Sequence, residues 1–331
     1  MKKILSLIMA VVLVAAMFVS CASNNDTAVV SSKTESVAPT SYDVNIAALA
    51  GPTGMGMAFM LNSDDTINNY NYTIAASPDE VTSKLLTGTY DIAALPTNVA
   101  ATLYNGSQGK IKLLALNTLG VLYILEKGDS IKNIKDLKGK TVYVSGQGST
   151  PEYVLRYLLE ENGLNPNKDV KLDFTYTAHA DLVAYAASGK ADVVVLPEPT
   201  VTALLAQNSD MRVAIDLNEA WADVVADDDD DEDSIISMGC VAVRTEFAQK
   251  NPEAVKNFLK DYEASVNKVN SDYAAASEKI AELGIVAKSA VALKALPRCN
   301  IVFVSGRKME SQIEDFYELL FEANPKSIGG K

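Results

Sequence analysis

Short runs of β-branched and other apolar residues alternate along the chain with segments in which apolar residues recur at every third or fourth position. Runs of the first kind at 44–49, 70–75, 91–95 and 112–117 predict buried strands, because they are short and end at turn-forming residues. Segments of the second kind predict helices between the strands. Strands that alternate with helices are typical of an α/β domain.

The same alternation continues through the rest of the chain. Further strands are predicted at 121–125, 142–144, 170–176, 192–196, 213–217, 235–243 and 301–304. Helices are expected to begin near Met57, Pro78, Thr97, Pro151, His179, Pro199 and Thr245, and to cover 253–283 and 309–321.

An internal repeat supports two α/β units. When residues 77–103 are laid over residues 178–204, five positions are identical and fall in the same predicted elements. The matched pairs are Gly88 with Gly189, Asp91 with Asp192, Leu95 with Leu196, Pro96 with Pro197 and Leu103 with Leu204. Both copies predict helix, turn, strand, Leu-Pro and helix in that order, so we interpret them as one α/β unit present twice.

A glycine-rich loop at 146–150 joins the strand at 142–144 to the following helix. Thr150 is expected to be the N-cap and Pro151 the first helical residue. The first-turn N–H groups of such a helix have no partner inside it and point at whatever lies in front. Taken alone, the loop could also be an ordinary strand-to-helix turn.

The N-terminus has the pattern of an export signal. Residues 1–20 combine Lys2 and Lys3 with an apolar stretch that is short for a membrane span, which predicts a signal peptide. Cys21 follows in a sequence that resembles a bacterial lipobox and would then be lipidated. Residues 21–41 are expected to form a tether, and the alternative is a plain secreted protein with an incidental cysteine.

Charge and cysteine content exclude several other classes. The formal net charge is -13 without any cluster of Lys or Arg, which argues against nucleic-acid binding. Cys240 and Cys299 have no metal-ligand spacing, so they could either pair or stay as buried thiols. The acidic run at 227–233 lacks the turning glycine of an EF-hand and is interpreted as a solvated loop.

Several loose motifs, taken in order, resemble a known family. They lie at 51–56, 77–80, 95–96, 137–141 and 146–151. The chain resembles the nitrate, sulfonate, taurine and thiamine-precursor class of ABC-importer substrate-binding proteins over about residues 42–331. The resemblance implies an α/β type II periplasmic-binding-protein fold, in which two α/β lobes are joined by two crossing strands and hold one ligand between them.

The resemblance also implies a domain organisation and partners. Lobe 1 would comprise 42–122 and 236–331, and lobe 2 would comprise 123–235. The protein would be a monomer that is held by its lipid on the outer face of the cytoplasmic membrane, within the cell envelope. It would pass a small molecule to the permease subunits of an ABC transporter, without catalysis, cofactor or metal.

Ligands of open α/β sheets lie beyond the carboxyl ends of strands. The candidate ligand-binding residues at these ends are Thr53, Gly54, Met55, Pro96, Thr97, Asn98, Thr118, Gly120, Gln147, Gly148, Ser149, Thr150, His179 and Glu198. Met55 could instead fill the core, and His179, the only histidine, could be a surface or capping residue.

The loops that carry these residues contain no Lys or Arg but do contain Glu198. Since buried anions are usually matched by charge-assisted hydrogen bonds, this favours a neutral or cationic ligand such as a nitrogen heterocycle. The alternative is an anion such as nitrate, a sulfonate or taurine, held by helix N-termini alone.

Two enzymes of similar fold are the rivals from another class, a pyrimidine synthase that uses pyridoxal and a menaquinone-pathway dehydratase. The chain has no cysteine cluster and no lysine in the expected cleft loops to form a Schiff base. The export signal also argues against both enzymes.

Overall fold

The computed structural model describes residues 39–176, 178–225 and 235–330. The predicted signal peptide, Cys21, most of the predicted tether and the acidic run at 227–233 lie outside the described residues. No helix within the described ranges is both long and apolar enough to cross a membrane.

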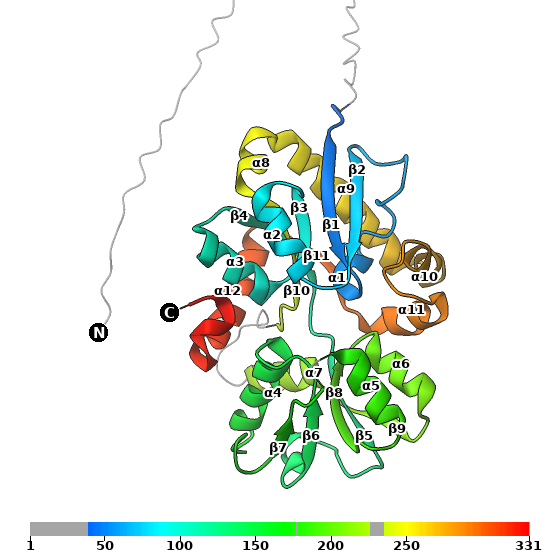
Figure 1. Ribbon diagram of the computed structural model, residues 1–331, viewed down its shortest axis with the longest axis vertical. Coiled ribbons are helices and arrows are strands. Elements are labelled where there is room, and N and C mark those ends of the chain that lie inside the picture. Colours follow the sequence, from blue (N-terminus) through cyan, green and yellow to red (C-terminus); the bar gives the residue numbers. More distant parts are fainter. Residues whose placement is uncertain (1–38, 177, 226–234, 331) are drawn as a thin grey trace, which may run out of the picture. The chain divides into compact units, whose positions relative to one another are not determined.

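The first of two sheets has six strands in the order β11-β4-β10-β3-β1-β2 (Figure 1). Its strands are β1 (Asp43–Leu49), β2 (Asn69–Ala75), β3 (Ile92–Pro96), β4 (Ile111–Thr118), β10 (Gly239–Arg244) and β11 (Ile301–Val304). β1 is parallel to β2 and β3, whereas β10 runs antiparallel to β3 and β4. The late strand β10 therefore lies between two early strands, β4 and β3, in the middle of the sheet.

The second sheet has five strands in the order β7-β6-β8-β5-β9. Its strands are β5 (Leu122–Lys127), β6 (Thr141–Val144), β7 (Lys171–Asp173), β8 (Val193–Pro197) and β9 (Met211–Asp216). β6 is parallel to β7 and β8, while β5 runs antiparallel to β8 and β9. The chain enters this sheet directly after β4 and returns to the first through residues 235–238. This is the predicted two-lobe α/β fold.

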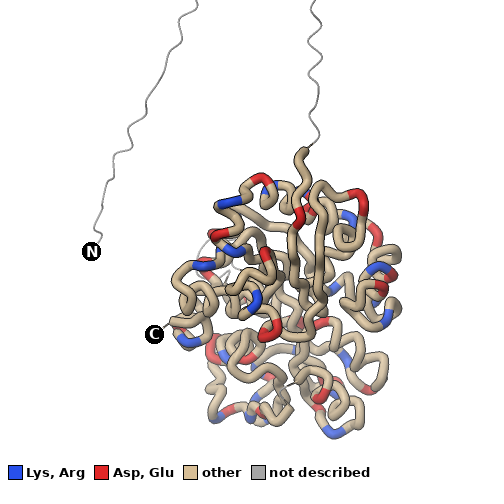
Figure 2. Tube along the Cα trace, turned by 45° about the horizontal axis from the view of Figure 1, so that its top comes forward, with Lys and Arg blue, Asp and Glu red and all other residues tan. Residues whose placement is uncertain are grey.

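Helices cover both sheets. Those packed with the first sheet are α1 (Pro52–Met55), α2 (Asp79–Thr87), α3 (Thr97–Ser107), α8 (Thr245–Lys250), α9 (Pro252–Ser271), α10 (Tyr273–Glu282) and α11 (Ser289–Ala295). Those packed with the second are α4 (Thr150–Glu161), α5 (His179–Ala187), α6 (Thr200–Gln207) and α7 (Leu217–Val225). α12 (Gly306–Ala323) is the last α-helix, and the 3₁₀ turns are η1 (Ile134–Leu137), η2 (Leu296–Arg298) and η3 (Pro325–Ile328). Figure 2 shows Lys and Arg interspersed with Asp and Glu along the described chain.

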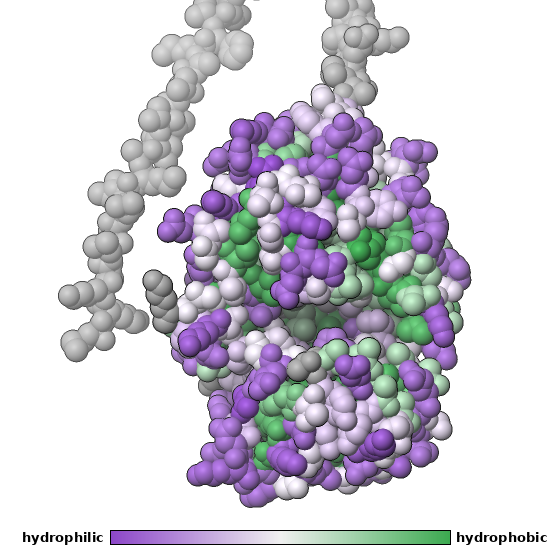
Figure 3. Space-filling model, in the orientation of Figure 1, coloured by the Kyte–Doolittle hydropathy of each residue, from purple (hydrophilic) through white to green (hydrophobic). Residues whose placement is uncertain are grey.

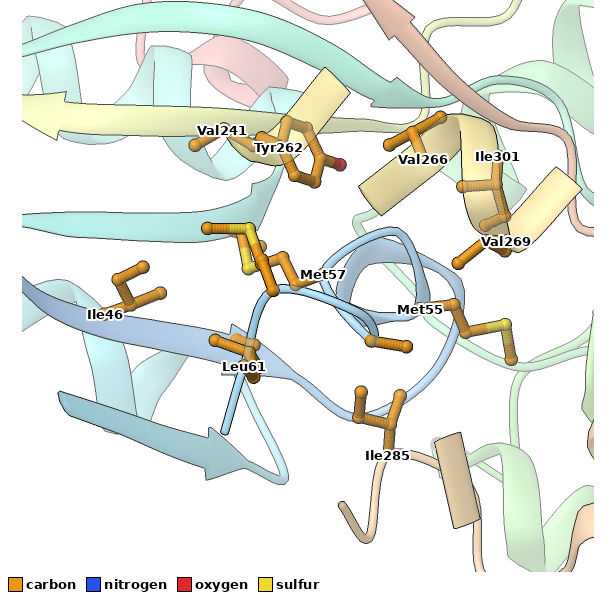
Figure 4. Packing of buried hydrophobic residues seen from close by; sticks show 14 of the residues in the cluster. Ile46, Met55, Met57, Leu61, Val241, Tyr262, Val266, Val269, Ile285 and Ile301 are labelled. Carbon is orange, nitrogen blue, oxygen red and sulfur yellow. The ribbon is translucent and has the colours of Figure 1, made fainter. Parts of the chain in front are cut away.

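Each face of each sheet carries its own hydrophobic core, because successive side chains of a strand point to opposite faces. In β1, for example, Ile46 and Ala48 belong to one core, and Ala47 and Leu49 to the other. Figure 4 shows the first of these cores, where Met57 and Tyr262 come from distant parts of the chain. Burying both faces explains why the strands are continuous apolar runs.

The repeat found in the sequence is present in the structure. Helix α2, strand β3 and helix α3 form one copy, and α5, β8 and α6 form the other. Each strand ends at the aligned proline, Pro96 or Pro197. In both copies a glycine in the left-handed region follows the first helix, with φ of 85° at Gly88 and 77° at Gly189.

The C-terminal helix α12 contributes to cores on both sheets. Met309 and Ile313 pack in a core of the first sheet, whereas Phe316 and Leu320 pack in a core of the second. The ring of Phe316 lies 5.9 Å from that of Trp221 in α7. One helix thus ties the two lobes together, in addition to the two crossings of the chain.

Some predicted elements were wrong. The helix expected from Met57 is instead the four-residue α1, followed by turns; the amide of Met57 bonds to the Gly54 carbonyl three residues back at 3.0 Å, which is the pattern of a turn. The helix expected over 253–283 is broken at Asp272, which caps α10. Helices α7 and α11 were not predicted, and β7 is shorter than the strand expected over 170–176. Cys240 and Cys299 are both buried free thiols and do not pair.

Candidate functional site

The loop between β6 and α4 is shaped by two glycines in the left-handed region. Gly146 has φ of 83° and Gly148 has φ of 72°, which other residues adopt only with strain. Ser149, and not Thr150, is the N-cap, and its hydroxyl donates to the Gly146 carbonyl. The side chain of Gln147 is exposed, and Gly148 is exposed as well.

Thr150 is the first residue of α4, one position later in the helix than predicted. It is 3% exposed, and its hydroxyl has no hydrogen-bond partner among the residues that the structure describes. A buried hydroxyl without a partner is costly and therefore rare in proteins. This hydroxyl is available to a bound molecule at the positive end of a helix dipole.

The carboxylate of Glu152 stabilises the glycine loop between β6 and α4. Its carboxylate accepts a hydrogen bond from the Gly148 amide at 2.8 Å and pairs with Arg156 Nε at 2.7 Å. The residue is only 8% exposed. Its charge is thus matched by Arg156 and by the first turn of the helix, as the sequence position suggested.

His179 lies against the same loop. Its Nδ1 is 2.6 Å from the hydroxyl of Ser145, the fully buried residue between β6 and Gly146. Burial lowers the pKa of His179 below its ordinary value of 6.5, so the ring is neutral at pH 7. Since Ser145 occupies one ring nitrogen, Nε2 is left for another contact. Sequence reasoning named His179 but missed Ser145, whose only signal was its place directly before the glycine loop.

Glu198 lies at the same edge of the second sheet, directly after β8. It is 1% exposed and accepts hydrogen bonds from the amide and the hydroxyl of Thr202, at 3.1 and 3.0 Å. It also pairs with Arg298 of η2, whose Nε and Nη2 both lie 2.6 Å from Oε1. The prediction of a base-poor cleft was therefore incomplete, because Arg298 arrives from a segment outside the loops considered.

Of the two candidate residues that follow Pro96 at the end of β3, Thr97 makes structural hydrogen bonds, whereas Asn98 is available to a ligand. The Thr97 hydroxyl donates to the carbonyl of Ser237, and the Thr97 carbonyl accepts from Tyr317 at 2.7 Å, so Thr97 secures the crossing and α12. Asn98 follows Pro96 and Thr97 and is 8% exposed. No hydrogen bond within the described part of the chain involves its side-chain amide, which leaves Asn98 the better ligand candidate.

The loop after β1 serves packing. Thr53 accepts a hydrogen bond through its carbonyl from Asn117 at 3.0 Å, and a Cβ at Gly54 would collide with the Leu49 carbonyl. Met55 has no exposed surface and belongs to the core drawn in Figure 4. Met55 thus has the core-filling place that was the alternative to a ligand contact.

Thr118 and Gly120 lie in the first crossing between the sheets. The Thr118 hydroxyl donates to Asn117 Oδ1 at 3.0 Å. A Cβ at Gly120 would lie 2.7 Å from the Cβ of Asn218. The Gly120 carbonyl accepts a hydrogen bond from the side-chain amide of Asn300. These contacts explain why a glycine is needed and leave Thr118 engaged with protein groups.

Figure 3 shows a hollow in the surface near the place where the chain passes between the two sheets. The hollow is floored by pale and apolar surface, with strongly polar residues around it. A separate hollow of about 580 Å³, bordered by η1, α4, β9 and α7, contains none of the candidate residues. The chemistry assembled above, from α4, His179 and Glu198, instead gathers at the edge of the second sheet where β6 and β8 end.

Comparison with known proteins places these features in context. A model of the family described as ABC transporter, phosphonate, periplasmic substrate-binding protein matches residues 69–281. Among curated proteins, no sequence matches the chain.

Solved structures match over nearly the whole described chain. An ABC transporter protein from Parabacteroides distasonis is 26% identical with a TM-score of 0.73, over 87% of this chain and 95% of that one. The periplasmic aliphatic sulphonate binding protein of Escherichia coli is 18% identical with a TM-score of 0.66, over 86% and 88%. The periplasmic nitrate-binding protein of Synechocystis is 14% identical with a TM-score of 0.56, over 82% and 76%.

Proposed function

Because the chain belongs to the phosphonate family of ABC-transporter periplasmic substrate-binding proteins, we propose that it captures a small oxyanion of the phosphonate or sulfonate type for import. The observation that carries this proposal is the buried, unpartnered hydroxyl of Thr150 at the start of α4. An oxyanion at this helix N-terminus would accept hydrogen bonds from the hydroxyl and from first-turn amides.

The residues around this position supply neutral donors. The neutral ring of His179 can offer an N–H through Nε2 when Nδ1 accepts from Ser145. The helix dipole adds about half a positive charge at the start of α4. A tetrahedral anion with several acceptor oxygens suits such a set of converging donors better than a flat heterocycle does.

A neutral or cationic ligand, favoured by the sequence, is the competing proposal. Its support is the Glu198 carboxylate at the same sheet edge and the side-chain amide of Asn98. The ion pair with Arg298 weakens that support, because the carboxylate is already engaged.

Capture would proceed by closure of the two lobes. In this proposal lobe 1 comprises 42–122 and 236–331, lobe 2 comprises 123–235, and the two crossings act as the hinge. The ligand shifts the balance toward the closed form only through contacts that are better in that form. The monomeric closed protein then docks on the permease subunits and performs no catalysis.

The proposal includes a lipid anchor at Cys21, after removal of residues 1–20, that holds the protein on the outer face of the cytoplasmic membrane. Cys21→Ser should release the protein from membranes into the soluble envelope or culture fraction. Retention of the variant in the membrane fraction would contradict the anchor.

The ligand class is tested by calorimetric titration of the mature protein with ethylphosphonate, ethanesulfonate, nitrate, a pyrimidine and an alkylamine. Native mass spectrometry of protein purified from its host would identify a retained ligand. Binding of a phosphonate or sulfonate supports the proposal. Binding of the pyrimidine or the amine alone would refute it and restore the neutral or cationic alternative.

A further inference from the structure

Arg298 and Glu198 form an ion pair between segments that are far apart in sequence. Arg298 belongs to η2, beside α11 and β11 of the first lobe, whereas Glu198 follows β8 of the second. The network has a third member, since Arg298 Nη2 donates to the Thr202 hydroxyl at 3.0 Å and that hydroxyl donates to Glu198 Oε1. Since Oε2 accepts from the Thr202 amide, both carboxylate oxygens of Glu198 have partners inside the protein.

The pair lies next to the proposed anion site. β6 and β8 are parallel neighbours, with Val144 opposite Val195. The loop after β6 and Glu198 after β8 therefore leave neighbouring strands at the same edge of the sheet. A ligand held at the start of α4 would lie at the edge from which Glu198 emerges, so an unmatched charge on Glu198 would act on it.

The position of Arg298 is fixed by the first crossing of the chain. Its carbonyl accepts a hydrogen bond from the Tyr123 hydroxyl at 3.2 Å. Two residues later, the Asn300 carbonyl accepts from the Leu119 amide at 3.1 Å. These hydrogen bonds fix the backbone around Arg298, so its guanidinium is held beside Glu198.

We propose that Arg298 is a specificity determinant that masks the carboxylate of Glu198 and so selects anions without a cationic substituent. This inference rests on the proposed function. An unmasked carboxylate at this sheet edge would repel an oxyanion and attract an ammonium group on the same ligand, each by about tenfold or more in affinity. With Arg298 in place, the carboxylate offers neither effect, and an ammonium group would be desolvated without a partner.

Two matched ligand pairs serve as probes: ethylphosphonate with 2-aminoethylphosphonate, and ethanesulfonate with 2-aminoethanesulfonate. For each pair, calorimetry gives the ratio of the two dissociation constants. The wild-type protein should bind the plain anion about tenfold or more tightly than its ammonium-bearing partner. Arg298→Gln should reverse or abolish this preference, whereas Arg298→Lys should largely retain it.

Glu198→Gln should shift the ratio further toward the plain anion, because it leaves Arg298 without its partner. It therefore tests the proposal even if Arg298→Gln does not fold. The double variant Arg298→Gln with Glu198→Gln should return the ratio to near its wild-type value. A wild-type preference for the ammonium-bearing ligands, or ratios that no variant changes, would overturn the masking role. If no anion binds the wild-type protein at all, the proposed function fails first.

Discussion

Thr150→Val should raise the stability of the ligand-free protein and lower its affinity for an oxyanion. The two side chains have nearly the same shape, so the change removes one hydroxyl and leaves the packing intact. Thr150 is 3% exposed, and within the described part of the chain its hydroxyl lacks a partner. Most substitutions at a buried position in a site cost stability, so a gain would be informative.

The expected magnitudes follow from that single hydroxyl. Leaving a buried polar group unsatisfied costs about 1–3 kcal/mol, of which we expect valine to recover about 1 kcal/mol. For a chain of this size that corresponds to a rise in Tm of about 2 °C. A hydrogen bond to a charged ligand contributes about 1.5–3 kcal/mol, so the dissociation constant should rise by about 10- to 150-fold.

The assay combines urea unfolding of the ligand-free proteins with calorimetric titration of ethylphosphonate. Thr202→Val is the matched control, because its hydroxyl is buried but donates to Glu198 at 3.0 Å. That variant should lose about 1–3 kcal/mol of stability. If Thr150→Val loses stability as well and binds with unchanged affinity, the hydroxyl is not an unused donor and the reasoning fails.

Three further outcomes are expected. Burial lowers the pKa of His179, so the contribution of His179 to the unfolding free energy is complete above pH 6.5 and is lost as the pH falls toward the lower folded-state pKa. Between pH 7 and 5, the wild-type protein should therefore lose more stability than His179→Asn. Parallel pH profiles of the two proteins would contradict this. Phe316→Ala should cost about 3–5 kcal/mol in denaturant unfolding, because α12 would leave a cavity beside the second sheet; a loss below about 1.5 kcal/mol would show that the helix is dispensable there. Gly120→Ala should lower the free energy of unfolding by about 1–3 kcal/mol through collision with Asn218. Gly106→Ala, with open space around it in α3, should raise the free energy of unfolding by about 0.5–1 kcal/mol. Equal effects of the two substitutions in thermal unfolding would refute the crowding argument.

Local patterns in the sequence carried much of the fold. The apolar runs at 91–95 and 192–196 became β3 and β8, and the aligned prolines marked where both strands end. The glycine loop before α4 was recognised because its residues determine the backbone directly. Helix bounds were predicted less well, since the helix expected from Met57 is the short α1 followed by turns.

The site was harder to predict than the fold. Thr150 and His179 were named from their places at helix starts, but Arg298 was not named, because it lies 100 residues from Glu198 in the chain. No motif surrounds Arg298, and periodicity says nothing about which distant side chains meet. Pairing between distant segments is set by tertiary geometry, so only the structure reveals that the carboxylate is paired with Arg298.

Helix α12 has a consequence for how the molecule is made. Met309, Ile313, Phe316 and Leu320 follow every strand of both sheets in the chain, so a ribosome synthesises them after the strands, yet these side chains complete a core on each of the two sheets. Neither sheet can therefore complete its cores before helix α12 has been synthesised. A truncation before Gly306 would therefore remove core side chains from both lobes at once, and neither lobe would fold completely.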